Sequence, residues 1–303
     1  MATVRLMTRV LVLDGGMGRE LKRIGAPFRQ PEWSALALIE SPDQVRIAHE
    51  AFARAGAEVL TSNAYAVVPF HLGREYFDSD GRRLAALAGE LARSVADEYG
   101  LRVAGSLPPL LGSYRPDLFT DVEARPILEM LVEAQAPFVD LWLAETMSSI
   151  AEVQLVRSVL DAAGDARPLW VSFTLEDETF GAGGAGVGRL RSGESVADAV
   201  SAAEGVGAQL MAFNCSQPEV MEWAIREAIA VGDLPVGVYA NVFDVGEHEG
   251  ANVTVNDLRN DVTPEAYLAF AERWVAAGAT MVGGCCGVGP EHVSALSARW
   301  AKG

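Results

Sequence analysis

The 303-residue sequence predicts an α/β fold, a (β/α)8 or TIM barrel with eight parallel strands. Eight short segments are apolar almost throughout instead of alternating, which is typical of parallel strands buried on both faces. Helical patterns follow most of these segments, and no linker-like break divides the chain. The length is ordinary for one such barrel, so residues 1–303 are expected to form a single domain.

The expected strands share a run of valine, leucine and alanine that ends at a polar residue or a glycine. The first of them, residues 10–13, ends at Asp14 and is followed by a glycine-rich turn. Such runs are too short for helices of ordinary length and are bounded by turn residues. The eight expected strands cover residues 10–13, 58–62, 103–107, 138–144, 169–174, 209–213, 235–240 and 279–282.

Helix signals lie between these strands. Ser41, Pro42 and Gln44 supply a cap, a first-turn proline and an acceptor three residues on, so a helix should begin here and end at Gly56. Another helix is expected to end at Gly100. Apolar residues at helical spacing predict the inward faces of three helices: Leu84, Leu87, Leu91 and Val95; Ile150, Val153, Val156 and Leu160; and Tyr267, Phe270 and Trp274.

The remaining helices are marked by prolines and hydroxyl caps. Pro126 lies in the helix expected after residue 120, which should therefore be kinked or begin late. Ser148 or Ser149 is expected to cap the helix after the fourth strand. Further helices are expected near Glu194, Pro218, Pro264 and Pro290.

The charge of the chain narrows the classes of partner. The net charge is −17 and the isoelectric point is near 4.6, which argues against nucleic acid or an anionic membrane surface. No apolar run is long enough to cross a bilayer, and no secretory signal is seen at the start. Three cysteines suit a reducing compartment. Small-molecule partners and a cytoplasmic location are therefore expected.

The three cysteines occupy two similar contexts. Cys285 and Cys286 are adjacent, lie between glycines and follow an apolar run, and Cys215 follows another. An odd number of cysteines argues against a disulfide framework. The alternative is three inert buried thiols, because free cysteine is often buried. Flanking glycines favour the other interpretation, three ligands for one zinc ion with a fourth position left open for substrate.

The predicted fold tests this interpretation. In a (β/α)8 barrel the working residues lie at the C-terminal ends of the strands. Cys215 follows the sixth expected strand, and the cysteine pair follows the eighth, so the three thiols can meet on one rim. The other polar residues expected on that rim follow the first, second and fourth strands: Asp14, Tyr65 and Glu145.

Zinc bound to three thiolates suits one kind of chemistry. The complex carries a formal negative charge, so it polarises a carbonyl poorly. A free alkyl thiol has a pKa near 8.5 and is mostly protonated at neutral pH, and coordination removes that proton. The expected reaction is therefore attack by a substrate thiolate on an electrophilic carbon.

The sequence resembles the homocysteine S-methyltransferases, a family of zinc-dependent barrels. The resemblance extends over essentially the whole chain, and the double cysteine is its most specific motif. It is carried by Leu13-Asp14-Gly15-Gly16-Met17-Gly18, Glu145-Thr146, Asn214-Cys215 and Gly283-Gly284-Cys285-Cys286-Gly287.

The resemblance implies roles for individual residues. Cys215, Cys285 and Cys286 correspond to the zinc ligands of the family. Glu145 corresponds to the carboxylate that receives the homocysteine ammonium, and Asp14 with the backbone of Gly15 corresponds to the turn that holds the amino-acid end. Two further residues are weaker candidates: Tyr65, which would fill the fourth zinc position before substrate arrives, and Thr61, which would contact substrate.

The resemblance also implies an activity. The leading hypothesis is transfer of a methyl group from a sulfonium donor, S-methylmethionine or S-adenosylmethionine, to L-homocysteine, giving methionine. After the seventh strand this chain has Ala240-Asn241-Val242-Phe243-Asp244 where sulfonium-using members tend to carry a Pro-Asn-Ser-Gly-Glu-like run. Betaine, another small donor, or another thiol or selenol acceptor is the alternative within the same chemistry.

Two hypotheses of other classes remain open. One is a metal-free barrel lyase or isomerase that uses Asp14 and Glu145 as acid and base. The other is a non-catalytic carrier of a thiol or a metal. The glycine-rich segment 181–188 matches G-x-G-x-x-G but lacks the strand-turn-helix context of a dinucleotide site, so it is expected to be a mobile loop that covers the donor.

Overall fold

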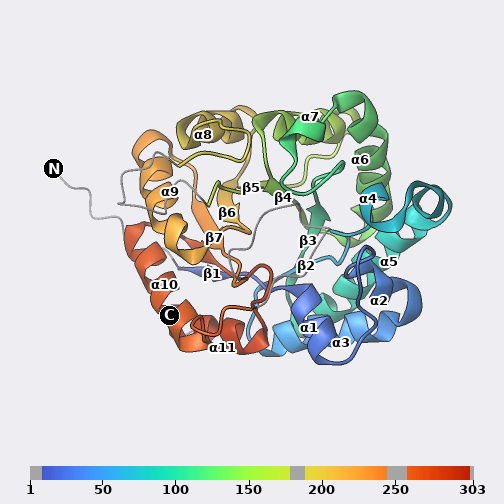
Figure 1. The fold of residues 1–303 in the computed structure, drawn as a ribbon, viewed down its shortest axis with the longest axis horizontal. Helices are drawn as coiled ribbons and strands as arrows, with labels where there is room; N and C mark the ends of the chain where they lie inside the picture. The colour runs from blue at the N-terminus through green and yellow to red at the C-terminus, as the bar shows by residue number, and fades with distance from the viewer. Residues whose placement is uncertain (1–8, 178–187, 244–257, 301–303) are drawn as a thin grey trace.

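A computed structural model describes residues 9–177, 188–243 and 258–300, which form a (β/α)8 barrel (Figure 1). The parallel strands lie side by side in the order β1-β8-β7-β6-β5-β4-β3-β2. A parallel bridge between Leu13 and Val59 joins the first strand to the second. The predicted fold class is confirmed. The strands are β1 (Leu11–Val12), β2 (Val59–Thr61), β3 (Arg102–Leu107), β4 (Leu141–Met147), β5 (Leu169–Phe173), β6 (Leu210–Asn214), β7 (Val236–Tyr239) and β8 (Met281–Val282).

Helices surround the strands, as Figure 1 shows. They are α1 (Met17–Arg23), α2 (Ala35–Glu40), α3 (Pro42–Arg54), α4 (Pro69–Leu72), α5 (Arg74–Tyr99), α6 (Asp121–Gln135), α7 (Ile150–Ala162), α8 (Val196–Gly205), α9 (Pro218–Val231), α10 (Pro264–Ala277) and α11 (Pro290–Trp300). The sequence did not predict α1, α2 and α4, because four to seven residues are too few to establish a helical period. Among the described residues, no helix is long and apolar enough to cross a membrane.

Two helix starts differ from expectation. The side chain of Ser41 accepts no capping hydrogen bond, although Ser41 precedes α3 and Pro42 opens it. Helix α6 begins at Asp121 and contains Pro126 in its second turn, so the prediction of a late start is wrong. The predicted cap of α7 by Ser148 or Ser149 is confirmed. Ser149 is the cap, and its side chain and that of Glu152 form a reciprocal capping box.

The fourth strand lies three residues later than predicted. Residues 136–138 form a 3-10 turn with a proline in its first positions, and this turn displaces the start of β4 to Leu141. The strand then continues to Met147 through Glu145 and Thr146, with an irregular register between Ala144 and Met147. Thr146 has φ of +60°. Glu145 is therefore held within a strand and not in the loop after it.

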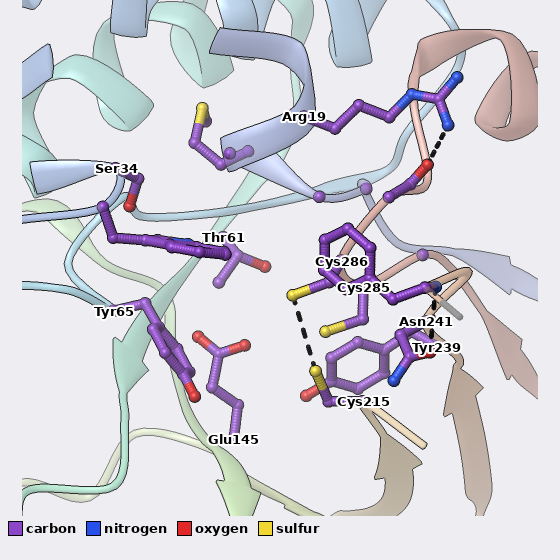
Figure 2. A pocket seen from close by; sticks show the side chains of 18 of the residues that line it. Arg19, Ser34, Thr61, Tyr65, Glu145, Cys215, Tyr239, Asn241, Cys285 and Cys286 are labelled. Atoms are coloured by element: carbon purple, nitrogen blue, oxygen red, sulfur yellow. Dashed lines mark hydrogen bonds between the residues drawn. The ribbon is translucent and has the colours of Figure 1, made fainter. Parts of the chain in front are cut away.

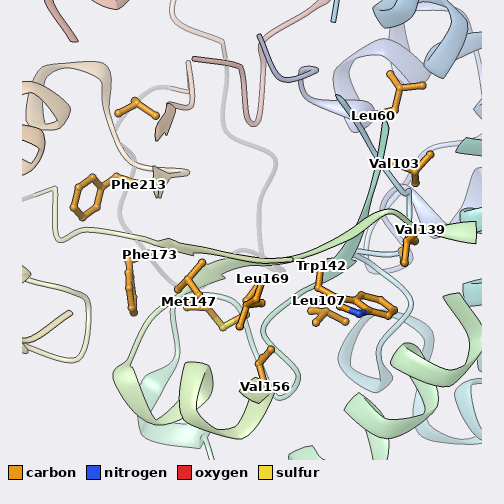
Figure 3. Packing of buried hydrophobic residues seen from close by; sticks show 14 of the residues in the cluster. Leu60, Val103, Leu107, Val139, Trp142, Met147, Val156, Leu169, Phe173 and Phe213 are labelled. Carbon is orange, nitrogen blue, oxygen red and sulfur yellow. The ribbon is translucent and has the colours of Figure 1, made fainter. Parts of the chain in front are cut away.

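The core has two layers. One layer fills the barrel interior with residues such as Leu143, Trp170 and Met281. The other lies between strands and helices, where Trp142, Met147, Leu169 and Phe173 pack (Figure 3). Of the predicted inward residues, Leu84, Val95, Val153, Val156, Leu160, Tyr267 and Trp274 are buried, whereas Leu87, Leu91, Ile150 and Phe270 are partly buried. On α5 the buried face also contains four alanines, Ala85, Ala88, Ala92 and Ala96.

Candidate metal centre and substrate pocket

The three cysteines lie together at the C-terminal ends of the strands (Figure 2). Cys215 follows β6, and Cys285 and Cys286 follow β8. Their sulfur atoms lie within 4.8 Å of one another, and Sγ of Cys215 is 3.7 Å from Sγ of Cys286. Tetrahedral zinc with Zn–S bonds of about 2.3 Å requires sulfurs roughly 3.8 Å apart. The donor set and its spacing therefore fit a thiolate-bound metal ion.

The cysteine pair is held by turns from both sides of the barrel seam. The Gly284 amide donates to the carbonyl of Asp14 (2.9 Å), and the Cys285 amide donates to that of Ala240 (3.0 Å). A Cβ on Gly16 would lie 2.4 Å from the carbonyl oxygen of Cys285. Only glycine permits this approach of the two turns. The glycines that flank the two motifs thus bring the vicinal thiols beside the end of β1.

Cys215 is placed by a strained backbone. Its φ is +52°, a left-handed conformation that costs a bulky residue of order 1 kcal/mol or more. The preceding residue, Asn214, compensates with side-chain hydrogen bonds to Thr146 on β4 and to the Ser172 hydroxyl (2.8 Å) on β5. The strain turns the Cys215 side chain away from the strand direction and toward the other two thiols.

The three thiols differ in pKa because their sulfur atoms contact one another. Hydrogen bonds with Cys285 and Cys286 lower the pKa of Cys215 well below its usual value. The same contacts with Cys215 raise the pKa of Cys285 and of Cys286 well above the usual value. The contact of the three sulfurs therefore favours negative charge on Cys215 over its two neighbours.

Two carboxylates face the same cavity. Asp14 is 4% exposed and Glu145 is 8% exposed. Burial raises the pKa of Asp14 to about 7 and that of Glu145 to about 8. In Figure 2 the Glu145 carboxylate lies between Tyr65 and the sulfur cluster, and it accepts a hydrogen bond from the Ser106 hydroxyl. Buried carboxylates of this kind gain most from a cationic partner.

Thr61 already donates two hydrogen bonds to the Asp14 carboxylate. The Thr61 amide donates to one oxygen of Asp14 (2.6 Å), and the Thr61 hydroxyl donates to the other (3.0 Å). A carboxylate has about four acceptor sites, so Asp14 retains capacity for a ligand. Thr61, which the sequence suggested as a substrate contact, uses its hydroxyl to orient this carboxylate. Gly15 follows Asp14, and a Cβ on Gly15 would lie 2.7 Å from the carbonyl oxygen of Val288.

The tyrosine nearest the thiols is not the one that the sequence suggested. The Tyr65 hydroxyl is hydrogen-bonded to Ser113 Oγ at 2.8 Å, although Tyr65 does line the pocket. Tyr114, the next residue after Ser113, donates its hydroxyl to Sγ of Cys215 at 2.9 Å. The sequence reasoning missed Tyr114, because it lies in the long loop between β3 and α6 outside any recognised motif. The role of Tyr65 at a metal stays a prediction.

The site opens into a pocket of about 630 Å³. Its walls include the predicted residues Asp14, Gly15, Thr61, Tyr65, Glu145 and the three cysteines. Aromatic residues outside the predicted site also line it: Phe28, Trp33, Tyr114, Tyr239 and Phe243. The rings of Phe28 and Trp33 lie 5.0 Å apart. A volume of this size suits one or two small molecules.

Parts of the sequence expectations lie outside the described residues. These are the glycine-rich residues 181–187, expected to cover a donor, and Asp244. The described part of the segment after β7 reaches the pocket through Asn241 and Phe243. The side-chain oxygen of Asn241 accepts a hydrogen bond from Gln217 at 3.1 Å.

Comparison with known proteins gives one consistent result. The family model described as homocysteine S-methyltransferase matches residues 11–300. The chain is 31% identical to a homocysteine S-methyltransferase of Escherichia coli K12 over 312 residues, covering 96% of this chain and 95% of the relative. It is 25% identical to a selenocysteine methyltransferase of Astragalus bisulcatus, with 95% and 91% covered.

A solved structure agrees with these sequences. The metallated form of the homocysteine methyltransferase MmuM from Escherichia coli superposes with a TM-score of 0.76 at 28% identity, and 97% of each chain is covered. Together, the family match along nearly the whole chain and the E. coli relative make the assignment. The chain is an enzyme that belongs to the homocysteine S-methyltransferase family.

Proposed function

We propose that this enzyme transfers a methyl group from a small sulfonium donor to the thiol of L-homocysteine, giving methionine, with Zn²⁺ held by Cys215, Cys285 and Cys286. The observation that carries the proposal is the clustering of three sulfurs within 4.8 Å in the same pocket as two buried carboxylates. Thiolate ligands favour zinc among the common divalent ions. The match along residues 11–300 supports one barrel domain as the unit of activity.

Glu145 and Asp14 would receive the amino-acid end of the acceptor. Glu145 is the stronger candidate for the ammonium, because its carboxylate lies beside the sulfur cluster and its pKa is raised to about 8 by burial. An ammonium placed against it would favour the ionised form. Ser106 and Thr61 orient the two carboxylates by hydrogen bonds, so that the acceptor thiol would be directed toward the cysteines.

When bound, the metal would lower the pKa of the acceptor thiol so that its proton is lost. The chain supplies the rest. Arg191 lies close enough for its positive charge to help lower the pKa of Cys215, and so offsets part of the negative charge that gathers at the sulfurs. The aromatic walls would exclude water from the space where the acceptor sulfur approaches the methyl carbon of the donor.

The aromatic walls support a cationic donor. Faces of tryptophan, tyrosine and phenylalanine attract a sulfonium or a quaternary ammonium, and six such residues line the pocket. In the proposed step the acceptor sulfur forms a bond to the methyl carbon while the bond from that carbon to the donor sulfur breaks. The electron pair of the broken bond stays with the donor, which leaves as a neutral sulfide, so charge is balanced.

Two variations share this chemistry. Betaine presents a quaternary ammonium that the same aromatic faces would accept, and it is the alternative donor. A selenol is the alternative acceptor, which the likeness to a selenocysteine methyltransferase favours. Both alternatives use the same thiol cluster.

The test is a donor panel on protein whose zinc content is measured on the same preparation. Homocysteine deuterated in its side chain is offered with S-methylmethionine, S-adenosylmethionine or betaine, and deuterated methionine is measured by mass spectrometry. The label distinguishes methionine made from the acceptor from methionine left by the donor. Parallel reactions offer selenocysteine as acceptor.

We expect about one zinc per chain, as thiolate sites bind zinc tightly, and labelled methionine from a sulfonium donor. Labelled methionine from betaine alone would replace the donor assignment. Turnover by zinc-free protein would contradict the metal-dependent mechanism and favour a metal-free barrel enzyme. Zinc without product from any donor and either acceptor would favour a carrier.

A further inference from the structure

The loop between β3 and α6 reaches across the barrel mouth to Cys215, the metal-ligand candidate that follows β6. Its residue Tyr114 donates a hydrogen bond to Sγ of Cys215 at 2.9 Å. The residue before it, Ser113, is buried and shares a hydrogen bond of 2.8 Å with the Tyr65 hydroxyl. The loop is therefore fixed at two successive residues, and the second of these holds the sulfur of a proposed ligand.

The ring of Tyr114 is held from its other side by Arg191. The guanidinium carbon of Arg191 lies 4.3 Å from the ring centroid, a cation–π contact. Arg191 is itself fixed by an ion pair with Asp177 at 2.9 Å, in which the two side chains are only 10% and 3% exposed. It also donates to the Thr174 hydroxyl at 3.1 Å. Buried pairs hold their geometry better than exposed ones, so the ring has a rigid support.

The backbone of the loop is bent to make this contact. Tyr114 has φ of +63°, as Cys215 has φ of +52°. A left-handed conformation is unusual for a tyrosine and persists only where surrounding contacts over-determine it. Here the contacts are those of Arg191 with the ring and of Cys215 with the hydroxyl. The left-handed backbone at both residues brings the Tyr114 hydroxyl to the Cys215 sulfur.

We propose that Tyr114 is a positioning residue for Cys215: its hydroxyl orients the sulfur and withdraws electron density from it, while Arg191 fixes the ring. The inference rests on the proposed function, since it takes Cys215 as a ligand of a metal. A hydrogen bond to a ligating sulfur stabilises its lone pairs and lowers the charge that three thiolates concentrate in one place. Loss of a partner of this kind typically weakens metal binding by about 10- to 100-fold.

The experiment compares Tyr114→Phe with wild type and with the control Tyr99→Phe. The control variant loses a hydroxyl that donates a hydrogen bond to Glu50 on the outer surface of the barrel. Zinc affinity is measured by competition with a chromophoric chelator, and the sulfur-to-metal charge-transfer band is recorded after loading with Co²⁺. Folding of each variant is checked by circular dichroism and thermal melting.

We expect Tyr114→Phe to bind zinc roughly tenfold more weakly, the lower end of the range for such partners, and to shift the Co²⁺ band to lower energy. The band shifts because a sulfur without its hydrogen bond gives up electrons more readily. Tyr99→Phe should match wild type in both. Arg191→Gln, which keeps the hydroxyl but removes both the support of the ring and a positive charge near Cys215, should shift the band in the same direction by a smaller amount.

Each outcome decides one question. If Tyr114→Phe matches wild type in zinc affinity and in band position, the positioning role is wrong. If the wild type takes up neither metal, the proposed metal chemistry fails and the role of Tyr114 fails with it. If metal binding and the band respond as expected but no donor gives methionine, the proposed reaction is wrong while the role of Tyr114 stands. Should Tyr114→Phe fail to fold, an unshifted band in Arg191→Gln overturns the inference.

Discussion

The side-chain amide of Asn214 is joined to Thr146 at two points. The Thr146 amide donates to Oδ1 of Asn214 at 2.9 Å, and Nδ2 of Asn214 donates to the Thr146 hydroxyl at 2.8 Å. Both residues are fully buried. Because Glu145 precedes Thr146 and Cys215 follows Asn214, one amide sets the separation of the proposed ammonium site from a proposed metal ligand.

Asn214→Ala should therefore weaken two functions at once. We expect the KM for homocysteine and the dissociation constant for zinc both to rise, and the free energy of unfolding to fall by roughly 1–3 kcal/mol because buried groups lose their partners. Enzyme kinetics, chelator competition and urea unfolding measure the three effects. Gln154→Ala, an exposed amide on α7, is the control. A rise in KM with unchanged zinc affinity would show that Cys215 is held independently.

Removal of a thiol tests the ligand set. Cys215→Ala should lose nearly all bound zinc and all methyl transfer, because two thiolates leave the ion with too few protein ligands. Metal analysis after dialysis and the labelled-methionine assay measure the two losses. Ser201→Ala, on the outer face of α8, should retain both. Activity in Cys215→Ala would remove this residue from the mechanism.

Glu145→Gln tests the ammonium site. We expect the KM for homocysteine to rise by roughly a hundredfold, as an ion pair with a buried carboxylate is lost, while zinc content stays near that of wild type. In the wild type, the KM should fall as the pH rises from about 6 to about 8, because the Glu145 pKa of about 8 requires ionisation before the ammonium is bound. Glu90→Gln, exposed on α5, should keep the wild-type profile. A KM independent of pH in the wild type would assign the ammonium to another group.

Stability should depend on pH in a direction opposite to that of most acidic proteins. Burial raises the pKa of Glu145 to about 8 and those of Asp14 and Glu152 to about 7. Between the ordinary pKa of a carboxyl, about 4, and these values the folded state binds more protons than the unfolded state, so the free energy of unfolding falls as pH rises. For metal-free protein at about pH 8, Glu145→Gln should be more stable than wild type by on the order of 2 kcal/mol.

Urea unfolding of metal-free wild type and Glu145→Gln at a series of pH values measures this effect. The two stability curves should converge toward about pH 4, where the carboxyl is protonated in both states of the chain. Parallel curves over the whole range would contradict the raised pKa of Glu145. Glu90→Gln again serves as the control.

The contact between the two glycine-rich turns can be tested with one methyl group. Gly16→Ala would place its Cβ 2.4 Å from the Cys285 carbonyl oxygen, so the turns must separate. We expect a loss of roughly 1–3 kcal/mol in the free energy of unfolding together with weaker zinc binding. Gly205→Ala is the matched control, because no atom lies within 4 Å of its added Cβ, and it should be neutral or slightly stabilising. Equal stability of both variants would show that the turns adjust freely.

The parts of the fold that the sequence predicted are those fixed by local patterns. All eight strands were found because each is an apolar run closed by a turn residue. The three thiols could be brought together because parallel strands direct their ends to one rim. The cap of α7 was predicted as Ser148 or Ser149 from residue type alone, and Ser149 forms it together with Glu152.

The remaining features depend on contacts between distant residues. Tyr114 reaches Cys215 from 101 residues away, and nothing near it in the sequence marks that partner. Thr146 and Cys215 adopt left-handed backbones that residue type alone disfavours. The start of β4 was predicted too early because residues 136–138 are apolar like the strand. They form a 3-10 turn instead.

The seam of the barrel has a consequence for biosynthesis. Strand β1 pairs with β8, and the turn after β1 accepts the Gly284 amide, so the first and last strands complete each other. A nascent chain that has not yet produced β8 holds one cysteine of three and an open sheet edge. If the three thiols bind the proposed metal, its capture must therefore wait until Cys285 and Cys286 have been made, and a product truncated before them would lack two of the three proposed ligands.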